Sequence, residues 1–149
     1  MSEISFASPV KGQLISIEKV NDPVFSQRLM GDGFAILPED EYFFAPFNAT
    51  VEMVFPTGHA IGLKSDDGLE VLIHIGLDTV KLKGEGFKML VSQGDKVIIG
   101  DPLIKVDLKL IKKRGYDLTT PIIFLSKEKV VSLNVSQCEA LQSNIVLFE

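Results

Sequence analysis

The stretch HAIGLKSDDGLEVLIHIGLDTV, residues 59–80, decides the fold. Apolar residues dominate both of its halves, as in buried or half-buried strands, and the SDDG between them is a typical hairpin signal. A two-residue loop of Asp66 and Asp67 places His59 directly opposite His74, and a loop shifted by one residue makes them diagonal neighbours. Only an odd-length loop or a bulge would separate the two rings.

Alternation along the second strand assigns its side chains to two faces of a sheet. The core face is expected to carry Leu69, Val71, Ile73, Ile75 and Leu77. The outer face is expected to carry Glu70, Leu72, His74, Gly76 and Asp78, joined from the partner strand by His59, Ile61 and Leu63. His74 therefore stands on a semi-apolar outer face beside the only other histidine of the chain, and Gly76 leaves room there for a partner or a phosphate.

The rest of the chain indicates an all-β protein. Short runs rich in valine, isoleucine and phenylalanine recur between glycine, proline and aspartate turns, at residues 12–17, 33–38, 49–55, 95–100, 102–108, 121–126 and 144–149. Only residues 22–30 and 109–115 could hold short helical turns. This pattern predicts a sandwich or barrel, and 149 residues suit a single domain, 1–149, with a real core.

A weak internal echo accompanies the strands. Residues 8–18 and 45–55 each have a small residue, a proline, an apolar residue and two spacers before an alternating strand. Residues 92–107 place two glycine-aspartate turns around a short strand. Such echoes suit a sheet built from duplicated hairpin units.

Composition and charge limit the class of function and the compartment. The formal net charge of −5 argues against a nucleic-acid partner, which would require a basic surface. The single cysteine, Cys138, forms no internal disulfide, which favours a reducing compartment. The first twelve residues show no signal peptide, and no window approaches eighteen uninterrupted apolar residues. We therefore expect a soluble cytoplasmic protein.

Several kinds of site could use two adjacent histidines besides a purely structural pair. Zinc normally takes three or four ligands, and only Asp78 joins the two imidazoles here. A nucleophilic serine or cysteine has no obvious candidate, because Ser65 lies at the hairpin tip and Cys138 is remote in sequence. A phosphohistidine requires less: one unprotonated ring nitrogen, an acceptor for the other, and donors for the phosphoryl oxygens, such as Thr57 or Thr79.

The stretch GLEVLIHIGLDTV, residues 68–80, resembles the phosphorylation-site signature of a known family, the glucose-type enzyme IIA family of the bacterial phosphoenolpyruvate-dependent sugar phosphotransferase system. Every position of that signature is met. Residues 31–38, 45–51, 56–68 and 81–88 are similar to the family too, and the resemblance runs from about residue 4 to residue 120. One departure is that the family's Thr-Asn-His is Thr-Gly-His here, with Gly58 beside His59.

The resemblance implies an antiparallel β-sandwich of the duplicated hybrid motif type, with few short helical turns and a shallow apolar active-site depression. It implies a phosphotransferase component without a cofactor, in which His74 accepts a phosphoryl group on Nε2 from phosphorylated HPr and passes it to a cysteine of an enzyme IIB domain for sugar uptake. His59 would help to hold the phosphoryl group, and Thr57 would hydrogen-bond His59. The implied docking positions are Asp22, Val24, Phe25, Leu29, Met30, Phe55, Leu72, Asp78 and Val80.

An alternative function is a regulatory binding module whose histidine face docks target proteins, with phosphorylation as the switch. A partner carboxylate could complete an intermolecular zinc site with His59 and His74. The membrane would be contacted only through the permease. For the phosphocarrier, the unperturbed imidazole pKa near 6.5 predicts that acceptance falls below about pH 6, as His74 protonates.

Overall fold

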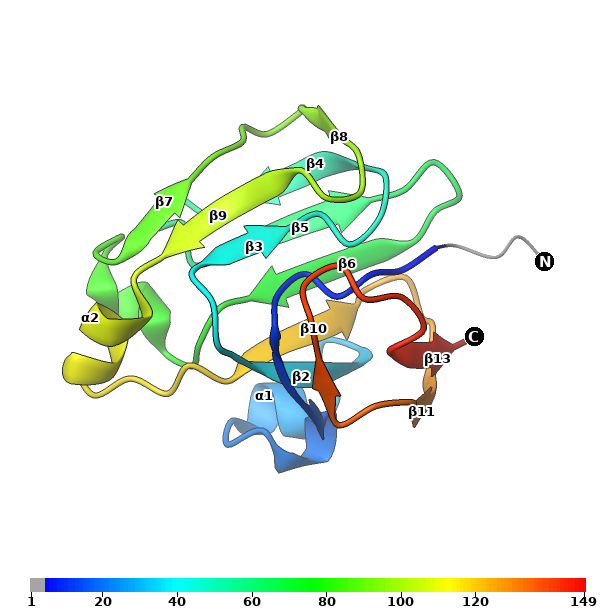
Figure 1. Cartoon of the computed structure of the whole chain (residues 1–149), viewed down its shortest axis with the longest axis horizontal. Coiled ribbons are helices and arrows are strands. Elements are labelled where there is room, and N and C mark those ends of the chain that lie inside the picture. The colour runs from blue at the N-terminus through cyan, green and yellow to red at the C-terminus, as the bar shows by residue number, and fades with distance from the viewer. Residues whose placement is uncertain (1–4) are drawn as a thin grey trace.

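The computed structural model describes residues 5–149 and confirms an all-β, antiparallel sandwich (Figure 1). Eight strands form the large sheet, in the order β12-β1-β2-β10-β6-β5-β4-β8. Their bounds are β1 Gly12–Ser16, β2 Asp32–Pro38, β4 Ala49–Val54, β5 Ala60–Lys64, β6 Glu70–His74, β8 Lys96–Val97, β10 Thr120–Phe124 and β12 Gln137–Cys138. The sheet ends at β12 and β8, so it is open and the fold is a sandwich rather than a closed barrel.

Two smaller sheets and four short helices complete the described part of the chain. The three-stranded sheet, in the order β3-β9-β7, consists of β3 Tyr42–Phe44, β7 Phe87–Met89 and β9 Pro102–Val106. The two-stranded sheet pairs β11 Val130–Leu133 with β13 Val146–Phe148. The helices are η1 Ile17–Lys19, α1 Pro23–Ser26, η2 Thr79–Leu82 and α2 Leu108–Lys113.

The large sheet is internally duplicated, which gives the sequence echo a structural counterpart. Its order is symmetric, because β1 pairs with β2 and β12 in one half as β4 pairs with β5 and β8 in the other. Equivalent hydrogen bonds recur: the Leu14 amide donates to the Ser136 carbonyl at 2.9 Å, and the Val51 amide donates to the Asp95 carbonyl at 2.8 Å. Residues 8–18 and 45–55 therefore open the two halves.

Both faces of the large sheet are covered. The main core lies between it and the three-stranded sheet, where fully buried Phe43 and Ile104 belong to the same cluster as Ile61 and Ile73. On the opposite face η1 and α1 pack over β2, β10, β6 and β5, and this second cluster consists of Ile17, Val20, Phe25, Ala35, Ala60, Leu72, Leu77 and Ile123. The second face carries the histidines, so the short helices form the walls around them.

The expected register of the hairpin is wrong by one residue. The β5–β6 loop spans three residues, 66–68, and the Ser65 amide donates to the Leu69 carbonyl at 2.9 Å. Gly68 closes it with a φ of +92°, the left-handed conformation that a three-residue hairpin loop requires at this position. Ala60, rather than His59 or Ile61, therefore lies opposite His74.

The structure corrects the expected face of three residues, two through the register and one through the end of the strand. Ile61 and Leu63 lie opposite Ile73 and Val71, so they point into the main core and not to the outer face. Leu77 was expected in the main core but belongs to the second cluster. The strand ends at His74, so strict alternation no longer applies to the residues after it.

No helix within residues 5–149 is long and apolar enough to span a membrane. Residues 1–4, the start of the stretch used to predict that a signal peptide is absent, lie outside the described residues. The expectation that residues 1–149 form one domain stays a prediction.

Candidate functional site

The two histidine rings lie together at one end of β5 and β6. Their centroids are 5.0 Å apart and the ring planes meet at 80°. The rings meet although Ala60 is the residue opposite His74, because β5 begins only at Ala60 and the chain turns sharply at Gly58, whose φ is +73°. The His59 carbonyl still accepts from the Ile75 amide at 2.7 Å, which ties the two strand ends together.

His74 has a main-chain partner that fixes its tautomer. Its Nδ1 lies 2.8 Å from the Gly76 carbonyl, and a carbonyl only accepts, so Nδ1 carries the proton. In the neutral ring the lone pair is then on Nε2. Burial lowers the pKa of His74, against the opposing effects of the Gly76 carbonyl and the charges of Asp22 and Asp78. The ring therefore stays neutral further into acid than an unperturbed imidazole, whose pKa is near 6.5.

His59 is the more enclosed ring, with 3% of its surface exposed. Its Nδ1 is hydrogen-bonded to the Thr57 hydroxyl, the pairing that the family resemblance implied. The Phe55 ring stands edge-on to it at 5.2 Å. Burial lowers the pKa of His59 to about 4, and the neighbouring His74 ring adds to the effect. Two neutral imidazoles therefore face each other at neutral pH.

The pKa of His59 predicts an acid-sensitive stability. Between pH 6.5 and about 4 the unfolded chain binds a proton that the folded His59 resists, so stability falls as the pH falls through this window. From pH 7 to pH 4.5 the loss due to His59 should be about 2–3 kcal/mol. We measure the free energy of unfolding in urea at pH 7 and at pH 4.5. We expect its decrease between the two pH values to be about 2–3 kcal/mol smaller in His59→Asn than in the wild type. Equal losses in both proteins would contradict the assignment.

The turn formed by residues 75–79 holds the Gly76 carbonyl against His74. Gly76 and Asp78 both adopt left-handed conformations, with φ of +79° and +58°. The hydroxyl of fully buried Thr79 donates to the Ile75 carbonyl at 2.5 Å. The Thr79 hydroxyl is thus directed at the main chain and not at the rings. It is therefore not the hydrogen-bond donor to the phosphoryl oxygens that the sequence offered.

The nine expected docking positions separate into exposed and supporting residues. Four apolar side chains are exposed, namely Val24, Leu29, Met30 and Val80. Phe25 and Leu72 are buried in the second cluster, and the Phe25 ring packs against the His74 ring with centroids 5.0 Å apart. These two therefore support the site from beneath, with half-buried Phe55 beside His59.

The two acidic docking positions also have structural roles. The Asp22 carboxylate caps α1 by accepting from the Val24 amide at 3.0 Å. Asp78 occupies the left-handed position at the start of η2 and is exposed. Both carboxylates lie near enough to His74 for their charges to oppose the lowering of its pKa by burial. The surface around the rings is therefore apolar with negative charge at its rim.

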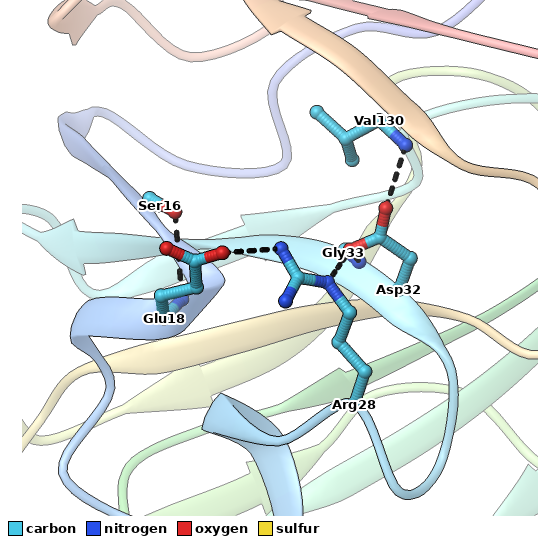
Figure 2. Close-up of polar contacts among 6 residues, drawn as sticks. All are labelled: Ser16, Glu18, Arg28, Asp32, Gly33 and Val130. Carbon is cyan, nitrogen blue, oxygen red and sulfur yellow. Dashed lines mark hydrogen bonds and ion pairs between the residues drawn. The ribbon is translucent and has the colours of Figure 1, made fainter.

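An ion-pair network, which the sequence did not indicate, anchors the segment 22–31 that carries much of this surface (Figure 2). Arg28 follows α1 in a left-handed conformation and donates to Glu18 at 3.0 Å and to Asp32 at 2.9 Å. Asp32 also accepts from the backbone amides of Gly33 and Val130, each at 2.9 Å. The only sequence signal was the i,i+4 spacing of Arg28 and Asp32.

The two partners in this network should contribute unequally to stability. Burial acts to raise the pKa of Asp32, but the amides of Val130 and Gly33, together with Arg28, outweigh it and lower that pKa. Asp32→Ala leaves two amides unpaired and should cost about 1–3 kcal/mol. Arg28→Ala removes only exposed ion pairs and should cost less than about 1 kcal/mol. Urea unfolding at pH 7 measures both, and an equal or reversed order would contradict the network's assignment.

Among residues 5–149 there is no group of three or more histidine, cysteine, aspartate or glutamate side chains that could hold a metal ion. Cys138 is buried with its sulfur 3.1 Å from the Ser8 hydroxyl, and Ser65 is buried at the hairpin loop, where its hydroxyl accepts from the Leu69 amide. Neither belongs to the histidine site. The two imidazoles and the Thr57 hydroxyl are the groups that the structure brings into direct contact at this site.

Comparison with known proteins places the chain in a family. The model of the phosphoenolpyruvate-dependent sugar phosphotransferase system, EIIA 1, matches residues 4–130. The chain is 47% identical over 133 residues to the PTS system glucose-specific EIIA component of Staphylococcus aureus, covering 89% of this chain and 80% of that protein. It is 50% identical over 135 residues to the glucose-specific EIICBA component of Staphylococcus carnosus, covering 91% of this chain and 19% of that longer protein.

Comparison of three-dimensional structures leads to the same family. The solved structure of the glucose permease IIA from Mycoplasma capricolum superposes with a TM-score of 0.85 at 37% sequence identity, covering 99% of this chain and 96% of that chain. The sandwich, the sheet order and the paired histidines are thus features of a chain that belongs to the EIIA 1 family of the phosphoenolpyruvate-dependent sugar phosphotransferase system.

Proposed function

We propose that this protein is a phosphocarrier in which His74 accepts a phosphoryl group on Nε2 from the phosphohistidine of HPr. It then passes the group to a cysteine of an enzyme IIB domain for sugar uptake. The observation that carries this proposal is the 2.8 Å contact between His74 Nδ1 and the Gly76 carbonyl. That contact leaves Nε2 as the nucleophilic nitrogen, and membership of the family supports its use for phosphoryl transfer.

The transfer requires positioning and charge stabilisation more than covalent help from the protein. As the bond from Nε2 to phosphorus forms, the bond from phosphorus to the donor nitrogen breaks, and its electron pair returns to the donor. The His74 ring gains positive charge, which the Nδ1–H bond to the Gly76 carbonyl stabilises. In the second step a cysteine thiolate bonds to phosphorus, and the electron pair of the breaking bond returns to Nε2.

His59 is assigned to hold the phosphoryl group. If the Thr57 hydroxyl donates to Nδ1 of His59, the proton of the neutral ring lies on Nε2, from which it can be donated to a phosphoryl oxygen. The ring stays neutral through the working pH range because burial lowers its pKa to about 4. Thr57 thus sets the tautomer of His59 as Gly76 sets that of His74.

The surface around the rings suits brief contacts with two successive partners. Exposed Val24, Leu29, Met30 and Val80 supply apolar area, while Asp22 and Asp78 favour a basic partner and speed its encounter. Transient interfaces of this kind bury less than about 1,200 Å². HPr and the IIB domain would use the same surface in turn. The proposal therefore includes a cytoplasmic location, with the membrane contacted only through the permease.

Intact-mass spectrometry after incubation with phosphoenolpyruvate, enzyme I and HPr tests the proposal. We expect one acid-labile phosphoryl group on the wild-type protein, and none when HPr is omitted. A folded wild-type protein that acquires no phosphoryl group from phosphorylated HPr would overturn the proposal.

A second candidate function is a regulatory binding module that docks target proteins through the same face. The observation that favours it is the exposed apolar set around His74, where a phosphoryl dianion would disrupt an interface. A carboxylate from a target could complete a zinc site with His59 and His74. Pull-downs with phosphorylated and unphosphorylated protein, with and without a chelator, test this function, and equal capture in all conditions would contradict it.

A further inference from the structure

We propose that Thr79 is a positioning residue that holds the turn of residues 75–79 so that the Gly76 carbonyl receives the proton of His74 Nδ1. This inference rests on the proposed function, because it explains why Nε2 of His74 is the nitrogen that reacts. Thr79 touches neither ring nor the transferred group in this assignment, and acts through the main chain alone.

Three hydrogen bonds fix the turn on both sides of Gly76. Thr79 is 0% exposed, and its hydroxyl donates to the Ile75 carbonyl at 2.5 Å. The Ile75 amide donates to the His59 carbonyl at 2.7 Å, and the Leu77 amide donates to the Asp117 carbonyl at 2.9 Å. Of these three bonds, only the one from Thr79 closes the turn upon itself, so its loss frees the Gly76 peptide most directly.

The methyl group of Thr79 contributes separately. A Cβ built on Gly76 would lie 2.5 Å from Thr79 Cγ2 and 3.0 Å from the Asp117 carbonyl oxygen. The methyl therefore packs closely against the Gly76 backbone, and threonine supplies a donor and a filler that neither serine nor valine supplies together. The two left-handed residues, Gly76 and Asp78, persist because these contacts over-determine the turn.

The position of the Gly76 carbonyl decides which nitrogen reacts. Without that acceptor the neutral ring would be free to carry its proton on Nε2, and its lone pair would point from Nδ1 into the turn. The bond also strengthens as the ring gains positive charge during transfer, because charge-assisted hydrogen bonds are about twice as strong as neutral ones. A displaced carbonyl thus lowers both the reactive population and the stabilisation of the transition state.

The test compares Thr79→Val, which keeps the shape and loses the donor, with Thr79→Ser, which keeps the donor and loses the methyl. Nitrogen-15 spectra of the imidazoles report the tautomer, and quenched-flow reports acceptance from phosphorylated HPr. We expect Thr79→Val to accept about tenfold more slowly or worse and to show growth of the Nε2–H tautomer of His74. We expect Thr79→Ser to remain within about threefold of the wild-type rate with the wild-type tautomer.

Ser8→Ala is the matched control. Ser8 is also 0% exposed, and its hydroxyl donates to the Val10 carbonyl at 2.6 Å, so the variant loses the same kind of buried bond. Its neighbours Cys138 and Gln142 belong neither to the 75–79 turn nor to the segment around Asp117 that contacts the turn. It should lose stability as Thr79→Val does while keeping the His74 tautomer. An equal tautomer change in both variants would reduce Thr79 to a structural residue and overturn the inference.

The tautomer measurement needs no partner protein, so it separates this inference from the proposed function. If the wild type is not phosphorylated but Thr79→Val still shifts the tautomer, the phosphocarrier fails and the role of Thr79 stands. If the wild-type neutral ring carries its proton on Nε2, the inference fails even where Thr79→Val does not fold. A folded Thr79→Val with an unchanged tautomer and rate would also overturn it.

Discussion

His74→Gln is expected to abolish phosphoryl acceptance from HPr, with a loss of at least about 1,000-fold, because the substitution removes the only nucleophilic nitrogen in the mechanism. Glutamine retains much of the size of the ring, so the packing of Phe25, whose ring lies 5.0 Å from that of His74, should change little. Acceptance is measured by intact mass and quenched-flow, with circular dichroism and urea unfolding to show that the variant is folded.

His59→Gln is the companion to this variant. His74 has a carbonyl at Nδ1 that prepares Nε2 for attack, whereas His59 is paired with a hydroxyl and is 3% exposed. We therefore expect His59→Gln to keep acceptance within about tenfold and to lose transfer to the IIB cysteine. If His59→Gln lost acceptance and His74→Gln retained it, the two roles would be reversed.

The histidine pair could be predicted from the sequence because two kinds of information agreed. The hairpin around SDDG brings the two ends of the stretch together, and the signature around His74 is long. The predicted register was nevertheless wrong, since the choice between a two- and a three-residue loop depends on a single backbone conformation, that of Gly68. The rings still meet because the chain departs from regular strand geometry at Gly58, which alternation does not describe.

Other elements could not be predicted because tertiary contacts decide them. The strands β3, β7, β11 and β12 are two to four residues long and have too few residues for a periodic signal. The network of Arg28, Asp32 and Val130 joins residues 98 positions apart, so the local i,i+4 spacing of Arg28 and Asp32 indicates only one of its contacts. The inward orientation of Thr79 depends on the turn after His74, whose left-handed residues are not determined by the signature alone.

Gly76→Ala is expected to have the largest effect on stability, a loss of about 3 kcal/mol or more, together with a loss of phosphoryl acceptance. The new Cβ would meet Thr79 Cγ2 at 2.5 Å and the Asp117 carbonyl oxygen at 3.0 Å, and alanine would be held at a φ of +79°. Because the side chain of Thr79 is buried and the Asp117 atom is main chain, neither can move aside cheaply. Urea unfolding measures the stability, and imidazole nitrogen-15 shifts report the displaced carbonyl.

Gly94→Ala is the control that separates backbone strain at a positive φ from a steric clash of the added Cβ. Gly94 has a φ of +93° but no atom within 4 Å of its added Cβ, so its substitution should cost only about 1 kcal/mol. In the double variant Gly76→Ala/Thr79→Ser the methyl is gone and the Asp117 contact remains, so part of the lost stability should return. The effects of two distant substitutions on the free energy of unfolding would simply add. A recovery of stability in the double variant therefore measures direct contact between residues 76 and 79. A Gly76→Ala protein as stable as Gly94→Ala would mean that the turn yields easily, and that Thr79 does not hold the carbonyl that prepares His74.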